Sequence, residues 1–244
     1  MANKFPRVRA QVLRASDGLQ APRRWWLPFL GGGSARAMAT DNPFVNVKYP
    51  ETVGAPMKDE HFLKGSTDMH KAAALLDAAK VDSLLAAGSK EVDTGDVLDQ
   101  TPLVLLARNH YDPPDVPKAV AMVKKIIAAG ATLTVDDKIR RDQYGDSVLH
   151  LAAMASGKNG PTILQALCDA LPAADKAALV SARCKNFGNT ALHWATLGGD
   201  ADSCQVLIDA GARLDRKNRL KETVVDYAVK YEQIKLKAKY ESLM

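Results

Sequence analysis

One short pattern recurs along this chain of 244 residues and limits its fold more than any other feature. In its fullest copy, residues 189–195 read Asn-Thr-Ala-Leu-His-Trp-Ala, and residues 207–212 read Leu-Ile-Asp-Ala-Gly-Ala. Gly188 suits a turn, and Thr190 suits capping of the helix that follows. Gly211 suits the left-handed end of a second helix. The pattern therefore predicts a helix-turn-helix unit, and because one such unit cannot bury its own apolar face, further copies are expected.

The same opening occurs at four other places in the sequence. Thr67 begins Thr-Asp-Met-His, Thr101 begins Thr-Pro-Leu-Val, Ser147 begins Ser-Val-Leu-His, and Thr223 begins a degenerate Thr-Val-Val-Asp. With Thr190 included, successive openings are 34, 46, 43 and 33 residues apart. A Thr-x-Leu-His-x-Ala opening, a closing Gly-Ala and a period of about 33 residues are typical of ankyrin repeats. The chain therefore resembles an ankyrin-repeat protein over roughly residues 63–230.

The resemblance implies an all-α fold, an ankyrin-repeat solenoid of about five helix-turn-helix units with short hairpin loops. We expect residues 63–244 to form this repeat domain and its C-terminal capping helix, and residues 1–62 to form an extended basic N-terminal arm. Only the two middle repeats are longer than the common period. One insertion, at residues 110–117, is too rich in proline for a helix, and the other, at residues 172–180, is expected to add a short helix.

Positive charge is concentrated in the N-terminal arm. Residues 1–40 hold seven basic side chains against one acidic side chain, a net charge of +6, while the remainder holds 26 basic and 27 acidic side chains. Arginine-rich stretches with few acids are typical of organelle presequences, so a mitochondrial location is expected. A plastid is the alternative, because Arg23 and Arg24 precede the apolar residues 25–30 and an Ala-Met-Ala at residues 37–39, as in a twin-arginine signal.

The arm also holds aromatic residues suited to contact with another surface. Trp25, Trp26 and Phe29 lie beside two arginines, a combination that favours the headgroup layer of a membrane. A pocket on a neighbouring subunit would suit the same rings, and both interpretations stay open. Phe44 lies in a stretch with alternating apolar residues between prolines, which is expected to form an extended strap docked on a partner. No run reaches the roughly 18 apolar residues of a transmembrane span.

The sequence lacks the common motifs of catalytic and nucleotide-binding sites. It has no Gly-x-Gly-x-x-Gly, no P-loop, no His-Glu-x-x-His and no Gly-x-Ser-x-Gly. Three histidines occupy equivalent positions of different repeats and are expected to be structural: His70, His150 and His193. The three cysteines have no metal-ligand spacing and are expected to be buried thiols: Cys168, Cys184 and Cys204. We therefore expect no enzyme activity, no cofactor and no metal ion.

Apolar residues also recur at the position three residues before four of the openings. The resemblance implies that the turns there project as finger-like hairpins and, with the first helix of each repeat, form the contact surface. The four residues are Leu98, Tyr144, Phe187 and Leu220. A column of apolar side chains exposed to water indicates a binding site for a partner. The alternative is that each side chain folds against its own hairpin.

The C-terminal segment, residues 223–243, contains neither glycine nor proline, so one helix, or two with a slight break, is expected. Its apolar residues fall on two opposite faces. We expect one face to cover the fourth repeat and the other, which includes Tyr240 and Leu243, to bind another protein, because a terminal cap is normally polar outside. The alternative is a bend that turns both faces inward.

These features lead to three hypotheses about function. The first is a non-catalytic structural or accessory subunit that mediates protein–protein contacts in a large organelle complex, above all a mitochondrial membrane complex such as the respiratory chain or ATP synthase. A mitochondrial ribosome would suit the basic arm, and a photosystem would suit the alternative twin-arginine interpretation. The second is a soluble ankyrin adaptor or regulator that binds one client protein. The third is attachment to nucleic acid through the arm, where Trp25 and Trp26 are the obvious stacking groups.

Overall fold

The structure is a computed structural model, and it describes residues 65–244 except residues 110, 112, 136–137, 143–144 and 160. The expected N-terminal arm, its presequence and its boundary at residue 62 lie outside the described residues. The same holds for the proposed contact residues of the arm, which are Trp25, Trp26, Phe29 and Phe44.

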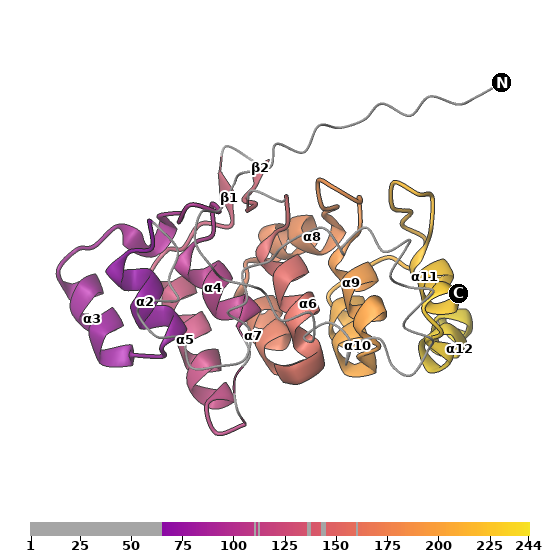
Figure 1. Ribbon diagram of the computed structural model, residues 1–244, viewed down its shortest axis with the longest axis horizontal. Helices are drawn as coiled ribbons and strands as arrows, with labels where there is room; N and C mark the ends of the chain where they lie inside the picture. Colours follow the sequence, from indigo (N-terminus) through magenta and orange to yellow (C-terminus); the bar gives the residue numbers. More distant parts are fainter. Residues whose placement is uncertain (1–64, 110, 112, 136–137, 143–144, 160) are drawn as a thin grey trace, which may run out of the picture.

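The described chain forms a row of helix pairs, which Figure 1 shows side by side in chain order. The five pairs are α2 (Asp68–Ala74) with α3 (Ala78–Ala86), α4 (Pro102–Arg108) with α5 (Val116–Ala128), α6 (Val148–Asn159) with α7 (Thr162–Ala170), α9 (Ala191–Gly198) with α10 (Ala201–Asp209), and α11 (Val224–Lys230) with α12 (Ile234–Leu243). A 3₁₀ turn, η3 (Glu91–Asp93), precedes α4. This arrangement confirms the expected all-α solenoid of five units.

The core lies between two layers of helices. The first helices pack on one another in the order α2, α4, α6, α9 and α11, and among the second helices α5 packs on α7 and α7 on α10. Leu106, Leu149 and Leu192 of the first helices are fully buried. Alanines at one equivalent position let neighbouring first helices approach closely, and all four are buried: Ala72, Ala152, Ala195 and Ala228.

The two long repeats differ from the rest in the way their insertions fold. The expected extra helix is present as α8 (Ala173–Ser181). The proline-rich loop is shorter than expected, because α5 already begins at Val116 with Pro117 in its first turn, where a missing N–H costs no helical bond. The connection that follows α5 contains an unexpected antiparallel pair, β1 (Thr134–Val135) and β2 (Lys138–Ile139), in which Thr134 lies opposite Ile139.

The C-terminal segment bends, and this bend corrects one expectation about its surface. Glu232 adopts a left-handed conformation with φ of +57° between α11 and α12, so the segment forms two helices. Tyr240 is then completely buried, and its hydroxyl oxygen lies 2.6 Å from Oγ1 of Thr196 in the fourth unit. The expectation that Tyr240 binds a partner is therefore wrong, because the bend brings this side chain against Thr196 of the fourth unit. Leu243, in contrast, is 53% exposed.

Candidate interaction surface

The connections between successive units project from one edge of the array as a row of loops (Figure 1). We call them fingers 1 to 4, and they comprise residues 87–101, 129–147, 182–190 and 210–223. Two residues before each helix opening, every finger has a residue in the left-handed conformation: Asp99, Gly145, Gly188 and Lys221, with φ of +57°, +83°, +66° and +64°. The repeated backbone geometry gives the four turns a common direction.

Side-chain hydrogen bonds hold the turns of the fingers in shape. In finger 1, Oδ1 of Asp96 accepts hydrogen bonds from the backbone nitrogens of Leu98 and Gln100, at 2.8 and 3.1 Å. In finger 4, Oδ1 of Asn218 accepts from those of Leu220 and Glu222, both at 2.9 Å. Asp and Asn favour such turns because their short side chains reach backbone donors two to four residues ahead.

Neighbouring fingers are joined to each other by backbone hydrogen bonds. The backbone nitrogen of Lys185 in finger 3 donates to the carbonyl oxygen of Gly145 in finger 2, at 3.1 Å, and that of Arg219 in finger 4 donates to Phe187 in finger 3, at 2.8 Å. The approach is so close that a Cβ atom on Gly145 would lie 2.0 Å from the Cβ atom of Lys185. Fingers 2, 3 and 4 therefore form one continuous surface.

The repeated histidines tie each first helix to the base of the next finger. In His150, Nδ1 accepts from the backbone nitrogen of Ser147 at 3.2 Å, so Nε2 carries the proton and donates to the carbonyl oxygen of Asn189 at 3.0 Å. The carbonyl partners of the other two rings are Gln100 for His70, at 2.9 Å, and Glu222 for His193, at 3.2 Å. Their position explains why the sequence repeats them.

Burial keeps these histidines uncharged. The rings of His70, His150 and His193 are completely buried, and desolvation lowers the pKa of each below its usual value of 6.5. For His150 and His193 the pKa falls to about 4. At neutral pH the three rings are therefore neutral hydrogen-bonding groups within the array.

The joint between the second and third units uses a different polar network, which the sequence pattern did not reveal. Val104 stands at the histidine position of the second unit. There Nε2 of the buried Gln100 donates to Oδ2 of Asp142 at 3.4 Å, and Arg108 donates to Oε1 of Gln100. The buried, hydrogen-bonded side chain of Gln100 thus takes the place of the histidine ring that the second unit lacks.

A comparison with protein families agrees with this geometry. A family model described as ankyrin repeats, in three copies, matches residues 115–218 and again residues 149–236. The two matches together extend over residues 115–236, which are 122 of the 244 residues. The chain belongs to the ankyrin-repeat family. No curated protein matches the sequence. Ankyrin repeats bind protein partners, so the array has a role in protein–protein interaction.

The expected column of apolar residues on the ankyrin fingers is uneven. Leu220 is 61% exposed, whereas Leu98 and Phe187 are half-buried. The ring of Phe187 packs edge-to-face on Trp194 of its own repeat, with the ring centres 6.3 Å apart. Tyr144 lies outside the described residues. The role of these four side chains in partner contact stays a prediction. Next to Leu98, Val97 is 56% exposed, although its position gave no signal in the sequence.

Exposed apolar side chains gather at the C-terminal end of the ankyrin array. Seven large apolar side chains are exposed in the described part of the chain, and only Leu75 and Val97 lie in its first two units. The other five lie within residues 220–244: Leu220, Val229, Ile234, Leu243 and Met244. Exposed apolar side chains are therefore concentrated at one end of the described array.

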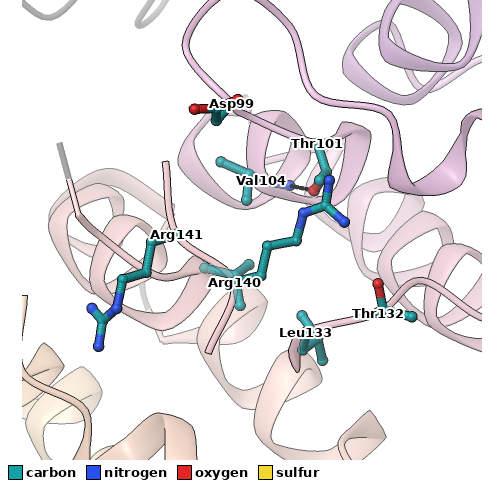
Figure 2. A pocket seen from close by; sticks show the side chains of 8 residues that line it. Asp99, Thr101, Val104, Thr132, Leu133, Arg140 and Arg141 are labelled. Atoms are coloured by element: carbon teal, nitrogen blue, oxygen red, sulfur yellow. Dashed lines mark hydrogen bonds between the residues drawn. The ribbon is translucent and has the colours of Figure 1, made fainter. Parts of the chain in front are cut away.

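A small cavity between the second and third repeats is too narrow for a ligand. Its volume is about 10 Å³, roughly the room that one water molecule needs. Figure 2 shows two consecutive arginines beside it that point in opposite directions, Arg140 toward Thr101 and Arg141 to the other side. Arg140 donates a hydrogen bond to the carbonyl oxygen of Asp93 in finger 1, while Arg141 donates to Gly145 in its own finger.

A larger hollow lies between fingers 2, 3 and 4, and basic side chains line it. Its volume is about 510 Å³. We call it the basic hollow, and its lining residues are Arg141, Arg183, Cys184, Lys185, Gly188 and Arg219. Two of the guanidinium groups are anchored to the backbone of their own fingers, since Arg141 donates to the carbonyl oxygen of Gly145 at 2.8 Å and Nε of Arg183 donates to that of Gly188 at 3.1 Å.

The described residues show no cluster of metal-ligand side chains, and their cysteine thiols are buried. No three His, Cys, Asp or Glu side chains in the described ranges come together as a metal ion would require. Burial raises the pKa of the Cys184 thiol, and it raises those of Cys168 and Cys204 to about 11, so all three stay protonated at neutral pH and are poor nucleophiles. No helix in the same ranges is both long enough and apolar enough to span a membrane.

Proposed function

We propose that this ankyrin-repeat protein is a non-catalytic accessory subunit that holds protein partners in a large organelle complex. The observation that carries the proposal is the exposed apolar surface at the C-terminal end. Ile234 and Met244 are 76% and 77% exposed there, and Val229 is 55% exposed. Side chains of this kind stabilise a complex when a partner removes them from water, and they favour association when nothing covers them.

We place the complex in mitochondria, as part of a membrane assembly such as the respiratory chain or ATP synthase. The support comes from the sequence of residues 1–40, which carries seven basic side chains and a single acidic one. This composition suits import into mitochondria. A plastid stays the alternative because of the paired Arg23 and Arg24.

The test is co-migration of the native chain with a complex. Organelle membranes from the source organism are solubilised in mild detergent and separated on a native gel, and the chain is detected with an antibody against its repeat domain. We expect a fixed ratio to the other subunits that survives roughly 0.5 M salt, because burial of apolar surface is not screened by ions. A chain that migrates as a lone monomer contradicts the proposal.

Two variants sharpen this experiment. The double change Val229→Ser and Ile234→Ser removes apolar surface at the C-terminal end and should release the chain from its complex. Leu75→Ser is the matched control, since Leu75 is also exposed, at 48%, but lies in the first unit. Equal release by both variants would show that the C-terminal end has no special role.

A soluble adaptor that binds one client reversibly is the second candidate. The basic hollow favours it, because charged surfaces act mainly on association rate and specificity. An adaptor predicts a stable monomer whose binding to the client weakens steeply with salt, in contrast to the salt-resistant subunit.

A further inference from the structure

We propose that the basic hollow binds an acidic segment of a protein partner, whose Asp and Glu carboxylates pair with Arg141, Arg183, Lys185 and Arg219. This inference rests on the proposed role in protein binding and specifies the chemistry of one partner. It places the contact on fingers 2 to 4 rather than on the helices α11 and α12 of the apolar C-terminal end.

The first argument is the order of charge along the row of fingers. Finger 1 has one basic residue against four acidic ones, a formal charge of −3, and finger 2 has three against four, a charge of −1. Finger 3 has two basic residues and no acidic residue, a charge of +2, and finger 4 has five against two, a charge of +3. The repeat domain is almost neutral as a whole, so this separation concentrates positive charge where the hollow lies.

The second argument is that the positive groups of the hollow are not neutralised within the described chain. None of the four forms an ion pair with a described carboxylate. Arg141 and Arg183 use one donor each for a backbone carbonyl, although a guanidinium group has five. The remaining donors suit carboxylates, which accept two parallel hydrogen bonds from one arginine.

The third argument is that nearby carboxylates are engaged elsewhere. Glu222 in finger 4 accepts hydrogen bonds from Nζ of Lys230 at 2.9 Å and from Nδ2 of Asn218 at 3.1 Å. Asp142 in finger 2 is buried, where it accepts bonds from the side chain of Gln100 and from its own turn. Glu222 and Asp142 thus shape the fingers rather than pair with the four basic groups of the hollow.

Protein is a better occupant than nucleic acid or the chain itself. No aromatic side chain is exposed in the described ranges, and single-stranded nucleic acids depend on exposed rings on which their bases stack. The N-terminal residues 1–40 carry a net charge of +6 and would be repelled from the hollow. A short extended acidic peptide requires only the carboxylate contacts that the hollow offers.

The experiment measures binding of a labelled peptide by fluorescence anisotropy, with the full-length chain. The probe is a peptide of about 12 residues in which Glu alternates with Ser, and a Lys-Ser peptide of equal length serves as the opposite-charge control. The hollow variant combines Arg183→Gln, Lys185→Gln and Arg219→Gln. We expect it to bind the acidic probe at least about tenfold more weakly than the unchanged chain, with a smaller dependence of affinity on salt.

A second variant removes the same amount of charge elsewhere. Lys90→Gln, Lys124→Gln and Lys235→Gln replace three exposed lysines outside the hollow. Because both triple variants lower the net charge by three, they lose the same long-range attraction, and only the hollow variant loses the local contacts. We expect the control variant to keep its affinity within about threefold. Circular dichroism checks that both variants fold.

Several outcomes would overturn the inference. Equal weakening by the two triple variants would show diffuse attraction, and absence of binding by the unchanged chain would show that the hollow does not take acidic peptides. Tighter binding of a single-stranded RNA with the same charge would assign the hollow to nucleic acid. Self-association that the hollow variant abolishes, measured by sedimentation, would assign it to finger 1 of a second copy. Co-migration in the native gel would still support the proposed subunit in each of these cases.

Discussion

The buried histidines make the stability of the array depend on pH, and the structure sets the direction and size of the effect. In the unfolded chain a histidine has a pKa near 6.5 and gains a proton as the pH falls from 7 to 5. In the folded chain burial holds the pKa of His150 and of His193 at about 4, so both rings stay neutral. The unfolded state therefore binds more protons, and acid favours unfolding.

The magnitude follows from these pKa values. The contribution that each neutral histidine makes to the free energy of unfolding is fully present above pH 6.5 and declines as the pH falls toward 4. Between pH 7 and pH 5 the free energy of unfolding should decrease by about 2 kcal/mol per histidine, or about 4 kcal/mol for His150 and His193 together. His70, whose pKa is also lowered, acts in the same direction. The depressed pKa values of Asp215 and Asp226 place their titration below this range.

The assay is urea unfolding followed by circular dichroism, performed at several pH values between 7 and 5. The double variant His150→Gln and His193→Gln should be less stable than the unchanged chain at pH 7, because two joints lose their rings. Its pH dependence should nevertheless be smaller by about 4 kcal/mol, since neither glutamine titrates. Comparing each protein with itself at two pH values separates this effect from the general loss of stability.

Two results would refute the reasoning. One is a free energy of unfolding that changes by less than about 1 kcal/mol between pH 7 and pH 5 in the unchanged chain. The other is a double variant that keeps the full pH dependence. Nuclear magnetic resonance provides an independent check that requires no variant, because the ring signals of His150 and His193 should not titrate above about pH 5 in the folded protein.

Three further predictions concern single residues. Gly145→Ala should destabilise the fold by about 2 kcal/mol or more, because its left-handed φ and the nearby Lys185 leave no room for a methyl group, and thermal melting measures the loss. Tyr240→Phe should cost about 1 to 2 kcal/mol in urea unfolding, because Thr196 loses its hydroxyl partner, whereas an unchanged midpoint would contradict that bond. Cys204 should resist iodoacetamide at pH 8 until the protein unfolds, as mass spectrometry can show, since its thiol is buried with a pKa of about 11.

The sequence predicts the units of this fold because their boundaries are marked by local signals. Thr190 and Gly211 identify the start and end of one unit through cap and turn chemistry, and the same residue types recur at known intervals. The spacing of the openings and the composition between them predict the extra helix α8 in the same way. The sequence does not decide whether the chain bends before α12, because Glu232 adopts the left-handed conformation without the glycine that would signal it.

Features that depend on contacts between units were harder to foresee. Gln100 and Asp142 are 42 residues apart and meet only when two units stack. The basic hollow likewise draws Arg141, Arg183 and Arg219 from three fingers. The sequence nevertheless carries a signal for the hollow in the net charge of each connection between repeats. The net charge of the whole repeat domain does not show it, because the charges of the acidic and basic fingers cancel.

The reversal of charge from finger 1 to finger 4 also gives the surface a direction. An extended partner chain that crossed all four fingers would be accepted in one orientation, with its acidic end over finger 4 and its basic end over finger 1. The same chain laid in reverse would place like charges opposite each other at both ends and be rejected. A partner with opposite charges at its two ends would therefore bind with a fixed N-to-C direction, which would set the side on which the rest of that partner emerges.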